Sequence, residues 1–308
     1  MSIILAASRA LIPLVLALPL PIGQVGPSVA GDTDVVQGDA DRYSRMTVPV
    51  RIGNSGPLDF LIDTGAQNTV IATSVATRLA LPAGRRATVI GIAGRQQVDT
   101  VEVDEILLGR RSFYGVLAPL LEREHIGADG ILGIDSLQDQ RVLLDFRRNL
   151  IAVDDAKALG GDRGYEIIVR ARRRSGQLIM TEATIDGIHV DVVIDTGAQS
   201  TIGNLALQRV LARRVQGEKA VLNSVTGQQV LADVAFARTL TFGGLDINNV
   251  GIAFTDAPPF GHLGLKKKPA LLLGMRELRA FNRVDIDFST RKVLFDLPRG
   301  LRGSFQRN

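Results

Sequence analysis

One motif occurs twice in this chain, and its duplication constrains the fold more than any other feature. Residues 60–70 read FLIDTGAQNTV, and residues 192–202 read VVIDTGAQSTI. A second landmark follows in each copy, GILG at residues 130–133 and LLLG at residues 271–274. Because the landmarks keep the same order and a similar spacing, one structural unit has been used twice, and the unit is far longer than a solenoid repeat.

Each copy consists mainly of short apolar segments that are typical of β-strands. The pair Asp186-Gly187 separates two such segments, 183–185 and 188–194, and an Asp-Gly pair in this setting predicts a β-hairpin. Each copy also contains two strands joined by a glycine-containing loop, predicted at 87–90 with 98–103 and at 220–223 with 229–234. Helices are predicted only at 204–215, with Asn204 as N-cap, and at 275–281. The fold class expected is therefore all-β with a few short helices.

The duplicated motifs resemble those of the aspartic peptidases of the pepsin and retropepsin superfamily. The resemblance rests on the two Asp-Thr-Gly-Ala loops and on the apolar-apolar-Gly landmark downstream of each, so it covers most of the chain after residue 31. It implies two closed, barrel-like lobes related by a pseudo-twofold axis, with Asp63 of one lobe facing Asp195 of the other. It also implies that the strands ending at Gly133 and Gly274 pass close behind the two loops.

Two facing carboxylates predict general acid–base chemistry. Carboxylates a hydrogen bond apart cannot both ionise cheaply, so they share one proton. The charged carboxylate can then accept a proton from a water molecule while the protonated one donates to a substrate carbonyl oxygen. By resemblance, we expect an aspartic endopeptidase with Asp63 and Asp195 as catalytic residues and a peptide or protein as substrate. The loop residues expected to support them are Thr64, Gly65, Ala66, Thr196, Gly197 and Ala198, and the resemblance implies that the two threonine hydroxyls cross between the lobes.

The chain departs from the pepsin pattern in ways that favour two retropepsin-like units in tandem. Alanine follows Asp-Thr-Gly in both copies, as in retroviral enzymes, and neither glycine-bearing hairpin has an aromatic residue at its tip. The substrate-binding residues predicted in these hairpins are Gly91, Ile92, Ala93, Gly94, Val225, Thr226 and Gly227. The short connector favours lobes that pair within one chain, and therefore a monomer, although pairing between two chains stays open.

The first thirty residues differ from the rest. Arg9 is the only charged residue before Asp32, and it precedes an apolar stretch and the small residues around Ala30. This arrangement is typical of a secretory signal peptide, which predicts an exported protein, periplasmic or secreted. The alternative is an uncleaved membrane anchor at residues 10–22 that leaves the catalytic part outside the cytoplasm. The domains predicted are a signal peptide (1–30), a first lobe (31–155), a connector (156–163) and a second lobe (164–308).

Composition removes several other classes of function. The chain has no cysteine, which excludes disulfides, thiolate metal sites and cysteine nucleophiles. Its three histidines, His125, His189 and His262, lack metal-ligand spacing, so no metal or cofactor is expected. The net charge of +4 is spread over short basic runs, and no nucleic-acid partner is expected. Two alternatives remain open: a non-catalytic peptide-binding or assembly protein on the same fold, and a hydrolase of a non-peptide amide bond.

Overall fold

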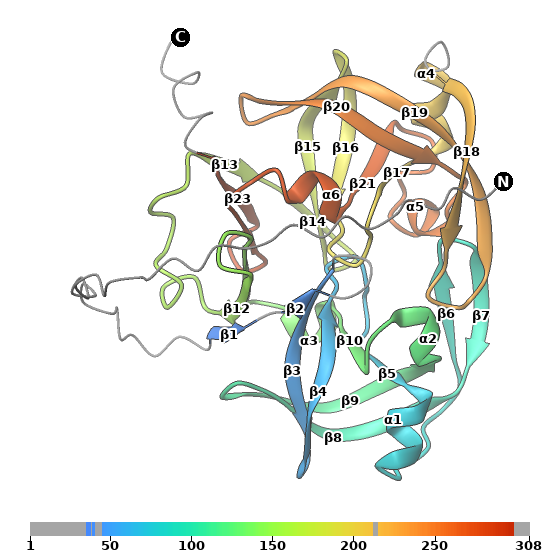
Figure 1. Ribbon diagram of the computed structural model, residues 1–308, viewed down its shortest axis with the longest axis vertical. Coiled ribbons are helices and arrows are strands. Elements are labelled where there is room, and N and C mark those ends of the chain that lie inside the picture. The colour runs from blue at the N-terminus through green and yellow to red at the C-terminus, as the bar shows by residue number, and fades with distance from the viewer. Residues whose placement is uncertain (1–34, 38, 41–44, 212–214, 299–308) are drawn as a thin grey trace, which may run out of the picture. The chain divides into compact units, whose positions relative to one another are not determined.

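Short β-strands make up most of the protein, as the apolar segments predict (Figure 1). The computed structural model describes residues 35–37, 39–40, 45–211 and 215–298, all of which belong to the compact unit Asp32–Asn308. The predicted signal peptide, residues 1–30, lies outside the described residues. The expected fold class, all-β with a few short helices, is confirmed.

The first half of the chain forms a closed β-barrel. Strand β3 pairs with both β4 and β8, so the order β3-β4-β10-β5-β9-β8 returns to its starting strand, while β2 continues the sheet beyond β3. Buried and exposed residues alternate along much of β3 and β8, because one face of each strand points into the barrel. The strands are β2 (Asp39–Ala40), β3 (Met46–Ile52), β4 (Ser55–Ile62), β5 (Val70–Ala72), β8 (Thr100–Leu108), β9 (Arg111–Leu121) and β10 (Gly130–Leu132).

The second half repeats this barrel. The order β15-β16-β21-β17-β20-β19 closes through the pairing of β15 with β19, and β14 and β18 extend the sheet. Asp186 and Gly187 both have positive φ angles (51° and 82°), as a tight two-residue hairpin turn requires, so the predicted hairpin is confirmed. The strands are β14 (Arg172–Arg174), β15 (Gln177–Ile185), β16 (Ile188–Ile194), β17 (Thr201–Gly203), β18 (Val215–Asn223), β19 (Gln229–Phe242), β20 (Leu245–Phe254) and β21 (Ala270–Leu273).

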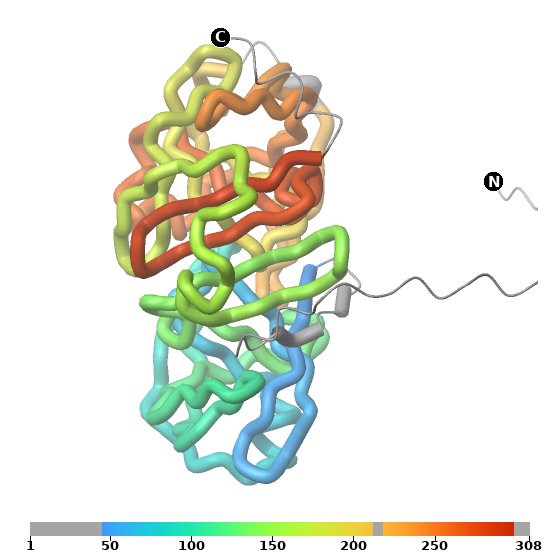
Figure 2. Tube along the Cα trace, turned by 90° about the vertical axis from the view of Figure 1, so that its left-hand side faces the viewer, coloured from blue at the N-terminus to red at the C-terminus, as the bar shows by residue number. Residues whose placement is uncertain are grey.

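A third sheet contains strands from both halves. Its order is β1-β12-β11-β22-β23-β13, and β11 (Arg141–Asp145) pairs antiparallel with β22 (Arg283–Asp287) at its centre. Figure 2 shows these green and red segments side by side, between the blue first half and the orange second half. The outer strands are β1 (Val35–Gln37), β12 (Leu150–Asp154), β13 (Ile167–Arg170) and β23 (Lys292–Asp296). The predicted connector, residues 156–163, falls between β12 and β13.

The helices are fewer than two turns long. Asn204 does cap α4, since its Oδ1 accepts the Leu207 backbone N–H at 2.8 Å. The prediction that this helix continues to Val215 is wrong, because α4 ends at Val210 and Val215 begins β18, where it pairs with Ala235. The helices are α1 (Thr73–Arg78), α2 (Arg123–Ile126), α3 (Ile134–Leu137), α4 (Leu205–Val210), α5 (Pro258–His262) and α6 (Met275–Leu278).

One predicted hairpin is also tighter than expected. Residues 87–90 were predicted to pair with 98–103, but β6 (Ala87–Gly91) pairs with β7 (Gly94–Val98), and Thr100 already belongs to β8. The two-residue turn at 92–93 lets Gly91 pair directly with Gly94, whose φ angle is 147°. Glycine adopts such angles readily, so the turn closes here and not farther along the chain.

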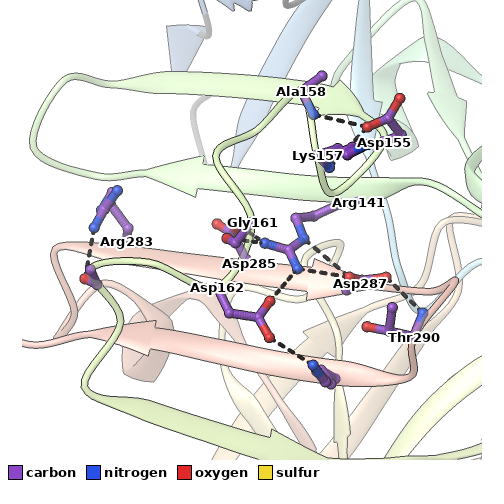
Figure 3. A network of polar contacts seen from close by, with 12 residues as sticks. Arg141, Asp155, Lys157, Ala158, Gly161, Asp162, Arg283, Asp285, Asp287 and Thr290 are labelled. Carbon is purple, nitrogen blue, oxygen red and sulfur yellow. Dashed lines mark hydrogen bonds and ion pairs between the residues drawn. The ribbon is translucent and has the colours of Figure 1, made fainter.

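Buried charges hold the shared sheet together. The Arg141 side chain, 1% exposed, lies among Asp162, Asp285 and Asp287 (Figure 3). Its Nη2 donates to Asp287 Oδ2 at 2.8 Å and to Asp162 Oδ1 at 2.7 Å, and its Nη1 donates to the Gly161 carbonyl oxygen at 2.6 Å. Asp285 Oδ2 lies 3.5 Å from Arg141 Nη1. One buried guanidinium therefore serves several acceptors, of which Asp287 is fully buried and Asp162 is 37% exposed.

The two buried carboxyls of β22 have opposite pKa shifts. Burial raises the pKa of Asp285 to about 7. Burial also opposes ionisation of Asp287, but hydrogen bonds from the Thr290 backbone and from Arg141 outweigh it and lower the pKa of Asp287. Ionisation of Asp285 therefore destabilises the folded protein, whereas ionisation of Asp287 stabilises it.

Replacing Asp285 with asparagine is therefore expected to stabilise the protein, and more so at pH 8 than at pH 5. A carboxyl whose folded pKa is raised gives stability at low pH that is lost as pH rises through that pKa, here near 7. The expected gain at pH 8 is on the order of 2 kcal/mol, measured by urea unfolding. The matched control, Asp287→Asn, should destabilise the protein at pH 8. A gain from Asp285→Asn that does not grow with pH would contradict the expectation.

Candidate active site

Both aspartates stand at the end of a strand that is held in place by a parallel neighbour. Asp63 follows β4, and its backbone N–H donates to the Leu132 carbonyl oxygen of β10 at 3.1 Å. Asp195 follows β16, and its backbone N–H donates to the Leu273 carbonyl oxygen of β21 at 3.0 Å. The duplication in sequence is thus repeated in the backbone geometry around each aspartate.

The glycine after each of these neighbouring strands has no room for a side chain. A Cβ atom on Gly133 would lie 2.5 Å from the Asn68 carbonyl carbon, and one on Gly274 would lie 2.7 Å from the Ser200 carbonyl carbon. Real Cβ atoms do not approach so closely. The ends of the two strands therefore lie directly against the aspartate loops.

The threonines tie the two loops together. The Thr64 hydroxyl donates to the Ile194 carbonyl oxygen at 2.8 Å, and the Thr196 hydroxyl donates to the Ile62 carbonyl oxygen at 2.7 Å. In return, each hydroxyl accepts a backbone N–H from the other threonine, at 3.0 Å for Thr64 N and 3.3 Å for Thr196 N. Four hydrogen bonds between buried groups fix the two halves of the site relative to each other.

Each carboxylate is oriented by its own loop and faces the glycine of the other. Oδ1 of Asp63 accepts the backbone N–H groups of Gly65 at 2.8 Å and Ala66 at 3.0 Å. Oδ1 of Asp195 accepts those of Gly197 and Ala198, both at 3.1 Å. A Cβ atom on Gly65 would lie 2.7 Å from Asp195 Cγ, and one on Gly197 would overlap the Asp63 carboxyl group. Glycine is thus required at both positions for the carboxylates to meet.

The environment favours a shared proton. Burial, and after it the negative charge of Asp63, together raise the pKa of Asp195 to about 8. Burial likewise raises the pKa of Asp63, against the hydrogen bonds from Gly65 and Ala66. Two acids that interact this strongly lose their protons in two separate steps that belong to the pair. Between those steps the pair holds one proton and one negative charge.

The aspartates line a cavity of about 410 Å³ whose walls come from both halves of the chain. One strand of each of two hairpins lines it, β6 of the β6–β7 hairpin in the first half and β18 of the β18–β19 hairpin in the second. Their ends touch, since a Cβ atom on Gly91 would lie 2.5 Å from Ser224 Oγ. A cavity of this size, with both carboxylates among its lining residues, has room for part of an extended peptide.

Several of the predicted substrate-binding residues line this cavity. Gly91, Ile92 and Val225 contribute to its wall, as do Gln67 and Gln199 beside the aspartate loops. Four predicted residues lie at the ends of the hairpins and do not contribute to the wall: Ala93, Gly94, Thr226 and Gly227. Gly227 packs instead against His125, whose imidazole ring a Cβ atom there would overlap.

The further residues that line the cavity include Arg45 and Gln177, which the sequence did not single out, and His125 and His262, which it gave no role. The His262 Nε2 atom lies 2.9 Å from Gln67 Nε2, whereas His189 is exposed on β16. Arg45 and Gln177 each precede the aspartate of their own half by 18 residues, so the spacing was a usable signal. In the part of the chain that the structure describes, no cluster of histidine and acidic residues could hold a metal ion.

Two closed barrels that present one Asp-Thr-Gly loop each to a common cavity define an aspartic peptidase fold. A family model described as aspartyl protease matches residues 48–136 and again residues 181–276, one match per half. The chain belongs to the aspartyl protease family. No curated protein matches it.

Proposed function

We propose that the protein is an exported aspartic endopeptidase that hydrolyses peptide bonds with a water molecule activated between Asp63 and Asp195. The observation that carries the proposal is the mutual geometry of the two carboxylates, each oriented by two backbone N–H groups and packed against the other loop's glycine. The singly protonated pair supplies a general base for the water and a general acid for the carbonyl oxygen. No covalent intermediate is needed.

The cavity supports an extended peptide as the substrate. The hairpins β6–β7 and β18–β19 cover the carboxylates, so a bound segment is shielded from water on that side. Excluding water strengthens the electrostatic interactions that stabilise the transition state. Gly91 and residues 221–225 line the wall, where an extended chain could form hydrogen bonds with their backbone.

The test is incubation of the mature protein, lacking residues 1–30, with a diverse peptide library and mass-spectrometric identification of the cleaved bonds. We expect cleavage within peptides, inhibition by a statine-type transition-state analogue, and no inhibition by a chelator. Analogue binding without any cleavage would identify a non-catalytic binding protein instead. Cleavage of a non-peptide amide alone would overturn the endopeptidase assignment.

Export is the second part of the proposal, and it rests on the composition of the first thirty residues. None of the described helices is long and apolar enough to cross a membrane. N-terminal sequencing of the protein recovered from the periplasm or medium is expected to begin near residue 31. Recovery of the intact N-terminus in the membrane fraction would instead indicate an anchor at residues 10–22.

We expect the active protein to be a monomer whose two lobes pair within one chain. The threonine hydrogen bonds and the shared β11–β22 pairing support this arrangement. Mixing Asp63→Asn protein with Asp195→Asn protein should then restore no peptide hydrolysis, and sedimentation should give the mass of one chain. Recovered activity in the mixture would show that lobes pair between chains.

A further inference from the structure

Arg45 and Gln177 occupy equivalent places in the two halves. Arg45 directly precedes β3, and Gln177 is the first residue of β15. The strand registers match, because Thr47 pairs with Leu61 in the first half and Ile179 pairs with Val193 in the second. In each pair the first residue comes two positions after Arg45 or Gln177. The second residue comes two positions before the aspartate of that half. The duplication therefore relates the two side chains by the pseudo-twofold axis.

The two side chains also make equivalent contacts across that axis. Arg45 Nη1 donates to the Gly197 carbonyl oxygen at 3.4 Å, and Gln177 Nε2 donates to the Gly65 carbonyl oxygen. Both are almost fully buried, with exposed fractions of 6% and 5%, and both line the cavity. Each side chain therefore holds the aspartate loop of the opposite half through a hydrogen bond to the carbonyl oxygen of the loop glycine.

Charge is the difference between them. The guanidinium of Arg45 is positive at every relevant pH, whereas the Gln177 amide is neutral. Within the described wall of the cavity, the other ionisable groups are the two aspartates, His125 of α2 and His262 of α5, and Arg45 is the only arginine or lysine. A second donor bond, from Arg45 Nη2 to the Ile126 carbonyl oxygen at 2.6 Å, keeps the guanidinium in place.

We propose that Arg45 is a positioning residue whose fixed positive charge stabilises the singly ionised form of the aspartate pair. The equivalent residue of the second half, Gln177, is neutral and supplies no such charge. The inference rests on the proposed function, because the singly ionised pair is the form that catalyses hydrolysis. A positive charge near a carboxyl favours its ionised form.

The electrostatics of the pair agree with this geometry. The charge of Arg45 lowers the pKa of both Asp63 and Asp195, in opposition to burial, which is the larger effect on each. Arg45 therefore offsets part of the cost of placing a negative charge in the cavity. Without the charge of Arg45, the pair would hold its protons to higher pH, and the singly ionised form would become populated only at a higher pH.

The test exchanges the two side chains. Arg45→Gln keeps an amide donor for the Gly197 carbonyl oxygen but removes the charge, so both limbs of the pH profile of kcat/KM should move up by about one pH unit. Gln177→Arg should move both limbs down. The double exchange, Arg45→Gln with Gln177→Arg, should return the profile close to that of the unaltered protein. Arg51→Gln, the same change at an exposed position of β3, is the matched control and should move neither limb.

A direct titration keeps this inference separate from the proposed function. The carboxyl carbons of Asp63 and Asp195 can be followed by NMR in protein enriched with ¹³C aspartate, with assignments from the asparagine variants. Their titration should shift upward in Arg45→Gln and stay near native in Arg45→Lys, even if no peptide is cleaved. An unshifted titration in folded Arg45→Gln would overturn the inference. If that variant fails to fold, an unshifted or upward-shifted titration in Gln177→Arg would do so.

Discussion

Replacing either Asp63 or Asp195 with asparagine is expected to reduce peptide hydrolysis by a factor of about 10³ or more. Asparagine has the same shape and can still accept the loop N–H groups, but it cannot share a proton with the remaining aspartate. Each single variant should therefore lose about as much activity as the double variant, because the two groups act as a unit. The measurement is kcat/KM on a peptide identified from the library.

The controls come from the same strands. Asp59 and Asp191 each lie four residues before the corresponding aspartate, on β4 and β16. Asp59→Asn and Asp191→Asn should leave activity within a few-fold of the unaltered protein. A variant of Asp63 or Asp195 that retains a tenth of native activity would contradict a site made of both carboxylates.

The asparagine variants of Asp63 and Asp195 should be at least as stable as the unaltered protein near neutral pH. Both carboxyls have pKa values raised by burial, so their ionisation costs folding free energy as pH rises, through about 8 for Asp195. Asparagine removes that cost. Thermal unfolding at pH 8 is therefore expected at or above the native temperature, which separates loss of catalysis from loss of fold.

Replacing Arg141 with methionine is expected to reduce the free energy of unfolding by about 3–5 kcal/mol at pH 7. The substitution leaves Asp287 and the Gly161 carbonyl oxygen without the guanidinium that serves them in a buried place. The loss should become smaller as pH falls below the unfolded pKa of Asp287, 3.8. Since the pKa of Asp287 is lowered in the folded protein, the stability it contributes is present above its unfolded pKa and is lost as pH falls through the folded value.

The duplication again provides the control. Arg283 is the counterpart of Arg141, because the β11–β22 register pairs Arg141 with Asp287 and Arg283 with Asp145. Arg283 is 30% exposed, whereas Arg141 is 1% exposed, so Arg283→Met should cost less than Arg141→Met. Urea unfolding measures both. Equal losses from the two variants at pH 7 would show that burial of the Arg141 network does not govern its contribution.

Elements with a local cause could be predicted from the amino-acid sequence alone. The Asp186-Gly187 turn is set by the positive φ angles that these two residues tolerate, and the cap at Asn204 is set by one side chain three residues from its partner. The two Asp-Thr-Gly loops were visible because the chain carries both copies. The resemblance then implied that Asp63 and Asp195 meet, together with the crossing threonines.

Features that depend on contacts between residues distant in sequence became visible only in the folded protein. Arg45 reaches the Gly197 carbonyl oxygen and Gln177 reaches that of Gly65, across more than a hundred residues, and their shared spacing from the aspartates does not reveal either contact. The shared sheet, with Arg141 among three aspartates, arises where β11 meets β22. Val215, which the sequence pattern assigned to the helix at 204–215, likewise pairs with Ala235 of β19. Hydrogen bonds and charges act over a few ångströms of space whatever the separation along the chain, so only the folded arrangement determines which of them form.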